Sequence, residues 1–259
     1  MQNNIVLTET LHEFTRNADL SQINIGCSGD NVIKITKTDG VYFLKYSDNS
    51  GIKTEYTKLQ WLCGKLPVPE IVSYEEQNGT YYLLTRALDG EMVCSRQYMQ
   101  NWQHGLKVIQ SAFEKLWSVD VTNCPFDESL ENKLKHIKTK LDNGLINPED
   151  INPELLEKYG GTIGLYKYLL ENKPTERLCF SHGDTSLPNI FGIGDKLTGF
   201  IDVSDCGLAD IWFDIAVTAK SIKRNYNETA LCAFYDFIKG KIGTVDYDAI
   251  EYYIKLVAF

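Results

Sequence analysis

The chain of 259 residues lacks an apolar run long enough to cross a bilayer, and it lacks an excess of basic residues. Its formal net charge is −9, which argues against a nucleic-acid-binding protein, because such proteins present a basic surface. The first residues contain no basic stretch followed by an apolar one, so we expect no signal peptide and a cytoplasmic location. We therefore expect neither a nucleic-acid nor a membrane partner, and a monomer or weak dimer. The acidic balance would suit a cationic ligand.

Several familiar sequence patterns are also missing. The seven cysteines are scattered and form no Cys-x-x-Cys pair, so neither a zinc site nor a disulfide framework is indicated. Neither a P-loop nor a dinucleotide fingerprint occurs, and no internal repeat is visible. What is present is a hydrophobic fraction of 43% and an aromatic fraction of 12%, which are ordinary for a protein with a packed core. The length allows one large domain or two modest ones.

The first third of the chain has the alternation and turns of an antiparallel sheet. Asp39-Gly40 and Asn78-Gly79 are typical of hairpin turns. The loop Gly26-Cys-Ser-Gly29, with Ser28 at its tip, can offer backbone N–H groups to phosphates, although Gly-x-x-Gly more often marks only a turn. We expect strands near 23–25, 31–35, 41–46, 71–75 and 80–85, and helices over 7–18 and 54–63.

Lys45 and Glu55 are the candidate charged pair of this region. Strand alternation places Phe43 on the same face as Lys45. Glu55 shares a helical stripe with Leu59 and Leu62, and a carboxylate on a buried stripe needs a partner. Lys45 is the obvious partner, although a lysine at the end of an apolar strand can also be a simple edge charge. A strand lysine paired with a helix glutamate is how kinases hold a lysine on nucleotide phosphates.

The segment Arg86–Gly90 is the candidate link to the rest of the chain. In a kinase-like arrangement the backbone at Arg86 and Leu88 would meet the adenine edge, and Phe43 would contact the purine ring. We therefore expect a nucleotide-binding lobe over residues 1–88 and a helical lobe with the catalytic loop and acceptor site over 89–259. In the second lobe we expect helices over 104–119, 132–141, 164–171, 209–222, 229–238 and 247–259, with one starting at Pro153 and a hairpin over 190–201.

The most informative stretch contains Asp184, Asn189 and Asp202. Asn189 follows Asp184 by five positions, and this Asp-x-x-x-x-Asn spacing matches the catalytic loop of protein kinases, in which an apolar strand ending in a metal-binding Asp follows. Phosphoryl transfer needs a carboxylate to orient a hydroxyl and oxygen ligands for Mg²⁺. The hairpin would bring Asn189 and Asp202 together at its base, where one cation could bind both. The alternative is a loop with a capping Asp and a turn Asn.

The order of these parts resembles the aminoglycoside phosphotransferases, in particular the aminoglycoside 3′-phosphotransferase branch of the protein-kinase-like fold. The likeness covers nearly the whole chain. It implies an α+β, two-lobed fold with a five-stranded antiparallel sheet and one key helix, followed by a mainly helical lobe. The residues that carry the likeness are Gly64–Pro69, Phe180–Asp184, Asn189–Phe191, Gly199–Asp202, Ala209–Asp210, Trp212–Ala216, Lys220–Ile222 and Tyr252–Phe259.

The resemblance implies transfer of the γ-phosphate of ATP, with GTP as the alternative nucleotide, to a hydroxyl of an aminoglycoside antibiotic, conferring resistance. Asp184 would be the catalytic carboxylate, and Asn189 and Asp202 would bind Mg²⁺. The implied phosphate-binding residues are Lys45, braced by Glu55, and Ser28. The alternatives are the same chemistry on a different small-molecule alcohol, or a nucleotide-binding protein without transfer activity.

On the acceptor side, the resemblance implies carboxylates, because the family's substrates are polycations. Glu154 and Glu157 fall where acidic loop residues are expected, and we add Asp205 and the terminal Phe259 to the expected acceptor residues. Asp205 stands where the family commonly has a basic residue. Acidic positions of the family after the 209–222 helix appear here as Arg224-Asn225. Structural roles in the active loop are expected for His182, Asp210 and Asp214.

Overall fold

The computed structural model describes residues 7–23 and 30–259. The chain divides into two units, Met1–Asp89 and Gly90–Phe259. Among the helices in these described ranges, none combines the length and the apolar character that crossing a membrane requires.

The first unit contains a five-stranded antiparallel sheet with the strand order β1-β2-β3-β5-β4. The sheet agrees with the sequence analysis except at its first strand, which was expected at 23–25. The side chains of β1 are exposed apart from Ile23, which is half-buried, so no apolar alternation marks this edge strand in the sequence. The elements are α1 (Glu9–Phe14), β1 (Asp19–Ile23), β2 (Asn31–Lys37), β3 (Gly40–Ser47), α2 (Gly51–Leu62), β4 (Ile71–Gln77) and β5 (Thr80–Arg86).

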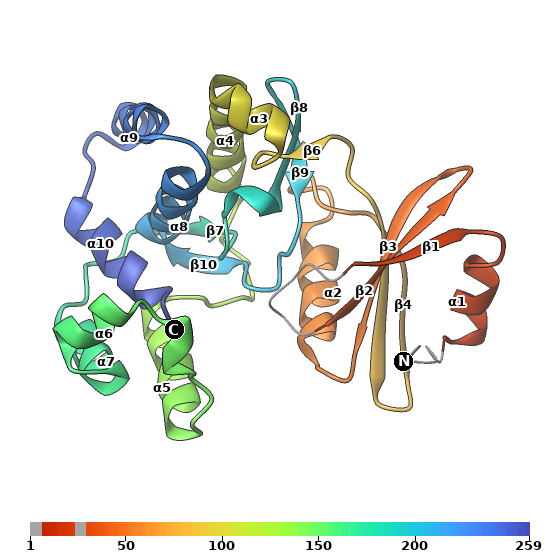
Figure 1. Cartoon of the computed structure of the whole chain (residues 1–259), viewed down its shortest axis with the longest axis horizontal. Coiled ribbons are helices and arrows are strands. Elements are labelled where there is room, and N and C mark those ends of the chain that lie inside the picture. The colour runs from red at the N-terminus through yellow and green to blue at the C-terminus, as the bar shows by residue number, and fades with distance from the viewer. Residues whose placement is uncertain (1–6, 24–29) are drawn as a thin grey trace. The chain divides into compact units, whose positions relative to one another are not determined.

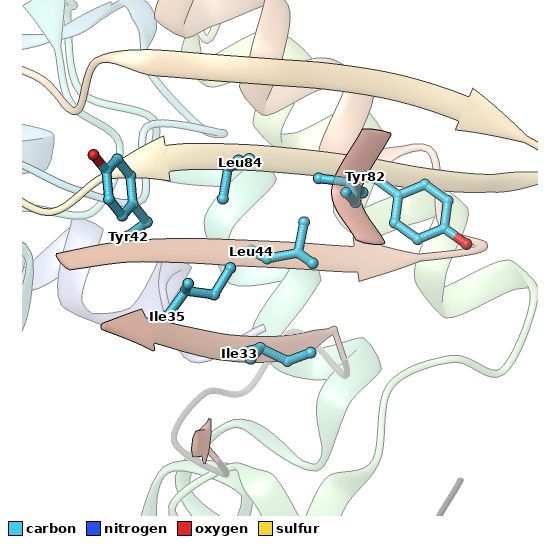
Figure 2. Packing of buried hydrophobic residues seen from close by; sticks show 7 residues of the cluster. Ile33, Ile35, Tyr42, Leu44, Tyr82 and Leu84 are labelled. Carbon is cyan, nitrogen blue, oxygen red and sulfur yellow. The ribbon is translucent and has the colours of Figure 1, made fainter. Parts of the chain in front are cut away.

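Two helices lie on opposite faces of this sheet (Figure 1). Helix α1 contributes Leu11 to the hydrophobic cluster on one face, while α2 packs against β3, β4 and β5 on the other. Each fully buried aliphatic side chain of such a cluster contributes about 1.5–3 kcal/mol. Figure 2 shows how the strand side chains of the first face gather into one cluster. The buried members are Leu11, Ile33, Ile35, Tyr42, Leu44, Tyr82 and Leu84.

The second unit is mainly helical and carries two small sheets. Strand β7 pairs with β10, and β8 pairs with both β6 and β9. Helix α8 is buried over most of its length, with Lys220, Lys223 and Arg224 exposed, and it packs against α9, α10 and β7 (Figure 1). The elements are β6 (Glu91–Met92), α3 (Arg96–Gln100), α4 (Trp102–Trp117), α5 (Leu130–Asp142), η1 (Pro148–Asp150), α6 (Pro153–Tyr159), α7 (Thr162–Glu171), β7 (Leu178–Ser181), η2 (Leu187–Asn189), β8 (Ile190–Ile193), β9 (Lys196–Phe200), β10 (Gly207–Asp210), α8 (Ile211–Asn225), α9 (Glu228–Ile242) and α10 (Tyr247–Leu256).

The start of α8 corrects one expectation. The helix expected from Ala209 begins at Ile211, and Ala209 lies in β10, paired with Cys179 of β7. Asp210 ends the strand with an extended backbone and caps the helix, because its carboxylate accepts a hydrogen bond from the Trp212 N–H at 3.4 Å. A strand of four residues that runs directly into a helix has too few positions for its alternation to be recognised in the sequence.

Candidate functional site

In the first unit, Lys45 and Glu55 form the expected ion pair. Lys45 Nζ donates to Glu55 Oε1 at 2.9 Å and to Oε2 at 2.8 Å. The Glu55 side chain is only 10% exposed and that of Lys45 is 27% exposed. A carboxylate this deeply placed is stable only when its charge is compensated. Strand β3 and helix α2 therefore hold the ammonium group of Lys45 in a defined position, as a phosphate-binding lysine requires.

Phe43 and Arg86 lie on different faces of the sheet. Phe43 is half-buried and shares the Lys45 face by strand alternation. The Arg86 guanidinium turns to the other face, where Nη2 donates to the Tyr42 hydroxyl at 3.1 Å. The Arg86 backbone N–H donates to the Glu70 carbonyl at 2.9 Å. The backbone carbonyl is therefore the group of Arg86 that remains for the predicted adenine contact.

Leu88 and Ser28 are the other two residues predicted to contact the nucleotide. Leu88 is half-buried and follows β5 at the end of the first unit. Ser28 lies outside the described residues. The nucleotide-binding roles of both residues stay predictions, as do those of Phe43, Lys45, Glu55 and Arg86.

In the second unit, α8 supports the loop that carries Asp184. Asp214 is only 3% exposed, and its carboxylate accepts hydrogen bonds from the backbone N–H groups of His182, at 2.8 Å, and Gly183, at 3.1 Å. Burial raises the pKa of Asp214, because a low-dielectric surrounding disfavours the charged form. The Thr185 hydroxyl donates to the Asp214 carbonyl at 2.9 Å. Asp214 is therefore a buried positioning residue: its carboxylate holds the backbone before Asp184, and its carbonyl holds the Thr185 side chain after it.

Gly183 allows the Asp205 backbone to approach the loop closely. Its φ is +87°, and a Cβ atom built there would lie 2.2 Å from the Asp205 carbonyl oxygen. A side chain at this position would meet both backbone strain and a steric clash. The segment after Asp202 is therefore held against the loop at a distance that only glycine permits.

The carboxylate of Asp184 is oriented by its own loop. The Asn189 side-chain amide donates to Asp184 Oδ2 at 2.8 Å, and the Ser186 N–H donates to Oδ1 at 3.1 Å. Each carboxylate oxygen thus has a fixed donor and retains a lone pair for a further partner. Asp184 is half-buried and lines a cavity, so it is accessible to a small molecule. This arrangement can orient a hydroxyl group and accept its hydrogen.

His182 connects the loop to the segment before Asp202. The Asp184 N–H donates to His182 Nδ1 at 3.2 Å, and His182 Nε2 lies 3.0 Å from the Ile201 carbonyl oxygen. Because Nδ1 accepts a hydrogen bond, the ring hydrogen belongs on Nε2, where it is donated to Ile201. The side chain is buried, and both ring nitrogens are engaged in backbone contacts. These backbone contacts are the kind that a structural residue makes, which is the role expected for His182.

Asn189 and Asp202 offer oxygen ligands of the kind that Mg²⁺ prefers. The Asn189 carbonyl accepts from the Ile201 N–H at 3.0 Å, which brings the hairpin base beside the residue preceding Asp202. The Asn189 amide nitrogen is committed to Asp184, so its Oδ1 points elsewhere. Within the described ranges no three His, Cys, Asp or Glu side chains gather into a metal cluster. Mg²⁺ is commonly held by one or two protein ligands plus phosphates, so this donor set fits that ion.

A cavity of about 480 Å³ lies beside Asp184 within the second unit. Gly183, Asp184 and Ser186 form part of its wall. Of the expected acceptor residues, Asp205 lines it. The cavity also reaches Leu256 and Val257, at the end of α10, whereas Phe259 is half-buried and is not part of the wall.

Glu154 and Glu157 lie elsewhere in the second unit. Both are exposed on the short helix α6, and neither belongs to the cavity wall. The structure thus brings Asp205 to the Asp184 cavity and leaves the two glutamates outside it. The acceptor-binding roles of all these residues stay predictions.

The basic part of the cavity wall was missed by the sequence analysis. It includes Lys133, His136 and Lys140 from α5, and Lys220 and Arg224 from α8. The signal was available, because residues three, four or seven positions apart on a helix lie on one face. The sequence of 132–141 predicts a basic amphipathic helix, but it does not show which part of the protein lies next to the basic face of that helix.

Comparison with known proteins places the chain in a family. The model of the phosphotransferase enzyme family, APH, matches residues 19–247. Aminoglycoside 3′-phosphotransferase of Niallia circulans is 35% identical over 257 residues, covering 97% of this chain and 96% of that protein. Aminoglycoside 3′-phosphotransferase of Enterococcus faecalis is 33% identical over 241 residues, covering 89% of each.

The fold of this chain is also similar to that of a solved phosphotransferase structure. The crystal structure of aminoglycoside-3′-phosphotransferase of type VIII superposes with a TM-score of 0.83 at 23% sequence identity, covering 96% of each chain. This likeness confirms the expected α+β, kinase-like fold. The family match extends over most of both units. The chain therefore belongs to the phosphotransferase enzyme family.

Proposed function

We propose that this enzyme transfers the γ-phosphate of ATP to the 3′-hydroxyl of an aminoglycoside antibiotic and thereby confers resistance. The observation that carries the proposal is the Asp184 carboxylate, oriented by Asn189 and Ser186 at the edge of a cavity large enough for a small molecule. The relatives named as aminoglycoside 3′-phosphotransferases supply the acceptor class. Among structural neighbours, an aminoglycoside phosphotransferase of Streptomyces rimosus was solved with ADP and streptomycin.

In the proposed reaction, Asp184 orients the acceptor hydroxyl and accepts its hydrogen. The hydroxyl oxygen forms a bond to the γ-phosphorus as the bond from that phosphorus to the bridging oxygen breaks, and ADP leaves. Such transfer depends on positioning and charge stabilisation more than on covalent chemistry by the protein. The hydrogen bonds that the loop backbone donates to the Asp214 carboxylate serve this positioning.

Asn189 and Asp202 are the proposed ligands of Mg²⁺, and Lys45, braced by Glu55, is the proposed phosphate-binding lysine. When bound, the ion supplies neutralisation of charge on the phosphates. ATP is the proposed nucleotide, and GTP is the alternative that a competition assay would distinguish. We further propose that the enzyme acts in the cytoplasm and that it is a monomer or weak dimer. Light scattering during size-exclusion chromatography would measure its oligomeric state.

A screen for ATP consumption across a panel of aminoglycosides, with mass detection of the product, tests the proposal. We expect kanamycin and related compounds with a free 3′-hydroxyl to gain the mass of one phosphoryl group. Analogues that lack this hydroxyl are the matched control and should remain unmodified. ATP binding without phosphoryl transfer to any acceptor would contradict the proposal and support a nucleotide-binding role alone.

The basic cavity wall favours a second candidate, in which the same chemistry acts on a different small-molecule alcohol. A polycation gains little from a wall that contains Lys140, Lys220 and Arg224. Adding neutral and acidic sugars to the same screen would separate the two candidates by the mass of the product.

A further inference from the structure

The charge of the Asp184 cavity differs from that of the whole chain. Its wall contains the cations Lys133, Lys140, Lys220 and Arg224 and the carboxylates Glu128, Asp184 and Asp205. With His136 neutral, four positive against three negative groups give a formal balance of +1. The whole chain carries −9. A locally positive cavity in an acidic protein requires a reason other than overall composition.

Three of the four cations in this cavity wall form no ion pair with the residues that the structure describes. Lys133 has a local role, because its Nζ lies 3.5 Å from Glu128 Oε2 and 4.2 Å from the centre of the Phe213 ring. Within the part of the chain that the structure describes, no carboxylate lies within 4 Å of the charged groups of Lys140, Lys220 or Arg224.

The three remaining cations are held on two helices. Lys220 and Arg224 are one helical turn apart on α8, and Lys140 is in the last turn of α5. Like charges at this spacing repel each other and are slightly destabilising on their own. An anion in the cavity would relieve this repulsion. Arginine in particular presents a planar set of donors that matches a carboxylate or phosphate group.

We propose that the acceptor cavity contains a binding site for an anionic group, a carboxylate or phosphate monoester, formed by Lys140, Lys220 and Arg224. The acceptors of the enzyme then include hydroxyl compounds that carry one acidic group. This inference rests on the proposed phosphotransfer at Asp184 and extends its acceptor class. The hydroxyl is oriented by Asp184, while the acidic group of the same molecule contacts the basic wall.

Direct binding of inorganic phosphate to the full-length protein tests the site without turnover. Isothermal titration is compared for the wild type, a cavity variant and a control variant. The cavity variant replaces Lys140, Lys220 and Arg224 by Gln. The control makes the same charge change at Lys135, Lys167 and Lys223, which lie on α5, α7 and α8 outside the cavity wall.

We expect the cavity variant to lose about tenfold or more in phosphate affinity, because charge-assisted hydrogen bonds are lost, while the control stays within about twofold of the wild type. Equal losses in both variants would overturn the proposal, since a general change of net charge would then explain them. All replaced side chains are exposed, so both variants should fold, which circular dichroism checks. If the cavity variant does not fold, Arg224→Gln alone is compared with Lys223→Gln.

A second titration, with a non-hydrolysable ATP analogue at saturation, separates an acceptor site from a nucleotide site. We expect phosphate still to bind with its affinity reduced by less than about threefold, because the nucleotide does not occupy the proposed site. Complete loss of phosphate binding would show that the same cations hold the nucleotide, and the proposal would then be wrong.

Turnover measures the acceptor class. Glucose, glucuronate and glucose 6-phosphate are compared as acceptors. We expect kcat/KM to be about tenfold higher for at least one of the two acidic sugars than for glucose. In the cavity variant, the ratio of kcat/KM for that acidic sugar to kcat/KM for glucose should fall towards one. The two acidic sugars distinguish carboxylate from phosphate recognition. Kanamycin phosphorylation without phosphate binding would overturn this inference alone. Phosphate binding without transfer to any acceptor would contradict the proposed phosphotransfer alone.

Discussion

The two units hold their key charged side chains in different ways. In the first unit, Lys45 is placed by one ion pair between a strand and a helix, both of regular geometry. In the second unit, Asp184 lies in an irregular loop that depends on Asn189, Ser186 and the buried Asp214. In the first unit, the position of the Lys45 ammonium group depends on two side chains. In the second unit, the position of the Asp184 carboxylate depends on many hydrogen bonds of a loop, so a substitution at an uncharged residue of that loop can also displace it.

Among changes that leave the charged side chains of both units in place, the largest effect is expected at Gly183, which has no functional group. Gly183→Ala would place Cβ 2.2 Å from the Asp205 carbonyl oxygen and force an unfavourable positive φ. The strained backbone alone costs about 1–2 kcal/mol. Because the loop must shift, we expect kcat to fall about 100-fold or more, as displacements near 1 Å can do.

Gly240→Ala is the matched control for this change. Gly240 lies in α9, and a Cβ atom built there meets nothing within 4 Å. Alanine should stabilise that helix by about 0.5–1 kcal/mol and leave kcat unchanged. Steady-state kinetics and thermal unfolding of both variants measure the contrast. Wild-type kcat in Gly183→Ala would show that the close approach of Asp205 does not fix the loop.

A smaller effect is expected when the Lys45 pair is weakened. Glu55→Gln removes the carboxylate charge, and we expect about 1–2 kcal/mol of lost stability, below the cost for a fully buried pair because Lys45 is 27% exposed. We also expect the KM for ATP to rise about tenfold, because Lys45 is then less firmly held. Denaturant unfolding and ATP-dependent kinetics measure these changes.

The exposed pair of Lys53 and Glu76 in the same unit provides the comparison. Their charged groups are 3.9 Å apart and their side chains are 59% and 49% exposed. Glu76→Gln should cost less than about 0.5 kcal/mol and leave the KM for ATP unchanged. Similar effects at Glu55 and Glu76 would mean that the Lys45 pair is an ordinary surface contact.

The difference between the units also explains which parts could be predicted from the sequence. Strand alternation and helical periodicity were sufficient to pair Lys45 with Glu55, because both residues lie on regular elements. The motif spacing was sufficient to select Asp184, Asn189 and Asp202 as candidates. It could not show that Asn189 would orient Asp184, because that contact depends on the path of an irregular loop.

The remaining differences have two physical causes, a local pattern too weak to recognise and the tertiary placement of an element. Strand β1 is an exposed edge and lacks an apolar pattern, and β10 is too short for its alternation to be recognised. The acidic residues Glu154 and Glu157 match the resemblance, yet α6 keeps them outside the cavity wall. Where tertiary placement decides which surface a side chain borders, periodicity alone gives no answer.

Replacement of Asp184 is the most direct test of the account. In Asp184→Ala, we expect kanamycin phosphorylation to fall about 1,000-fold or more, because the oriented acceptor of the hydroxyl hydrogen is lost. ATP affinity, measured by equilibrium titration, should stay within a few-fold of the wild type. Phosphorylation at the wild-type rate by this variant would contradict the assignment of Asp184 as the catalytic carboxylate.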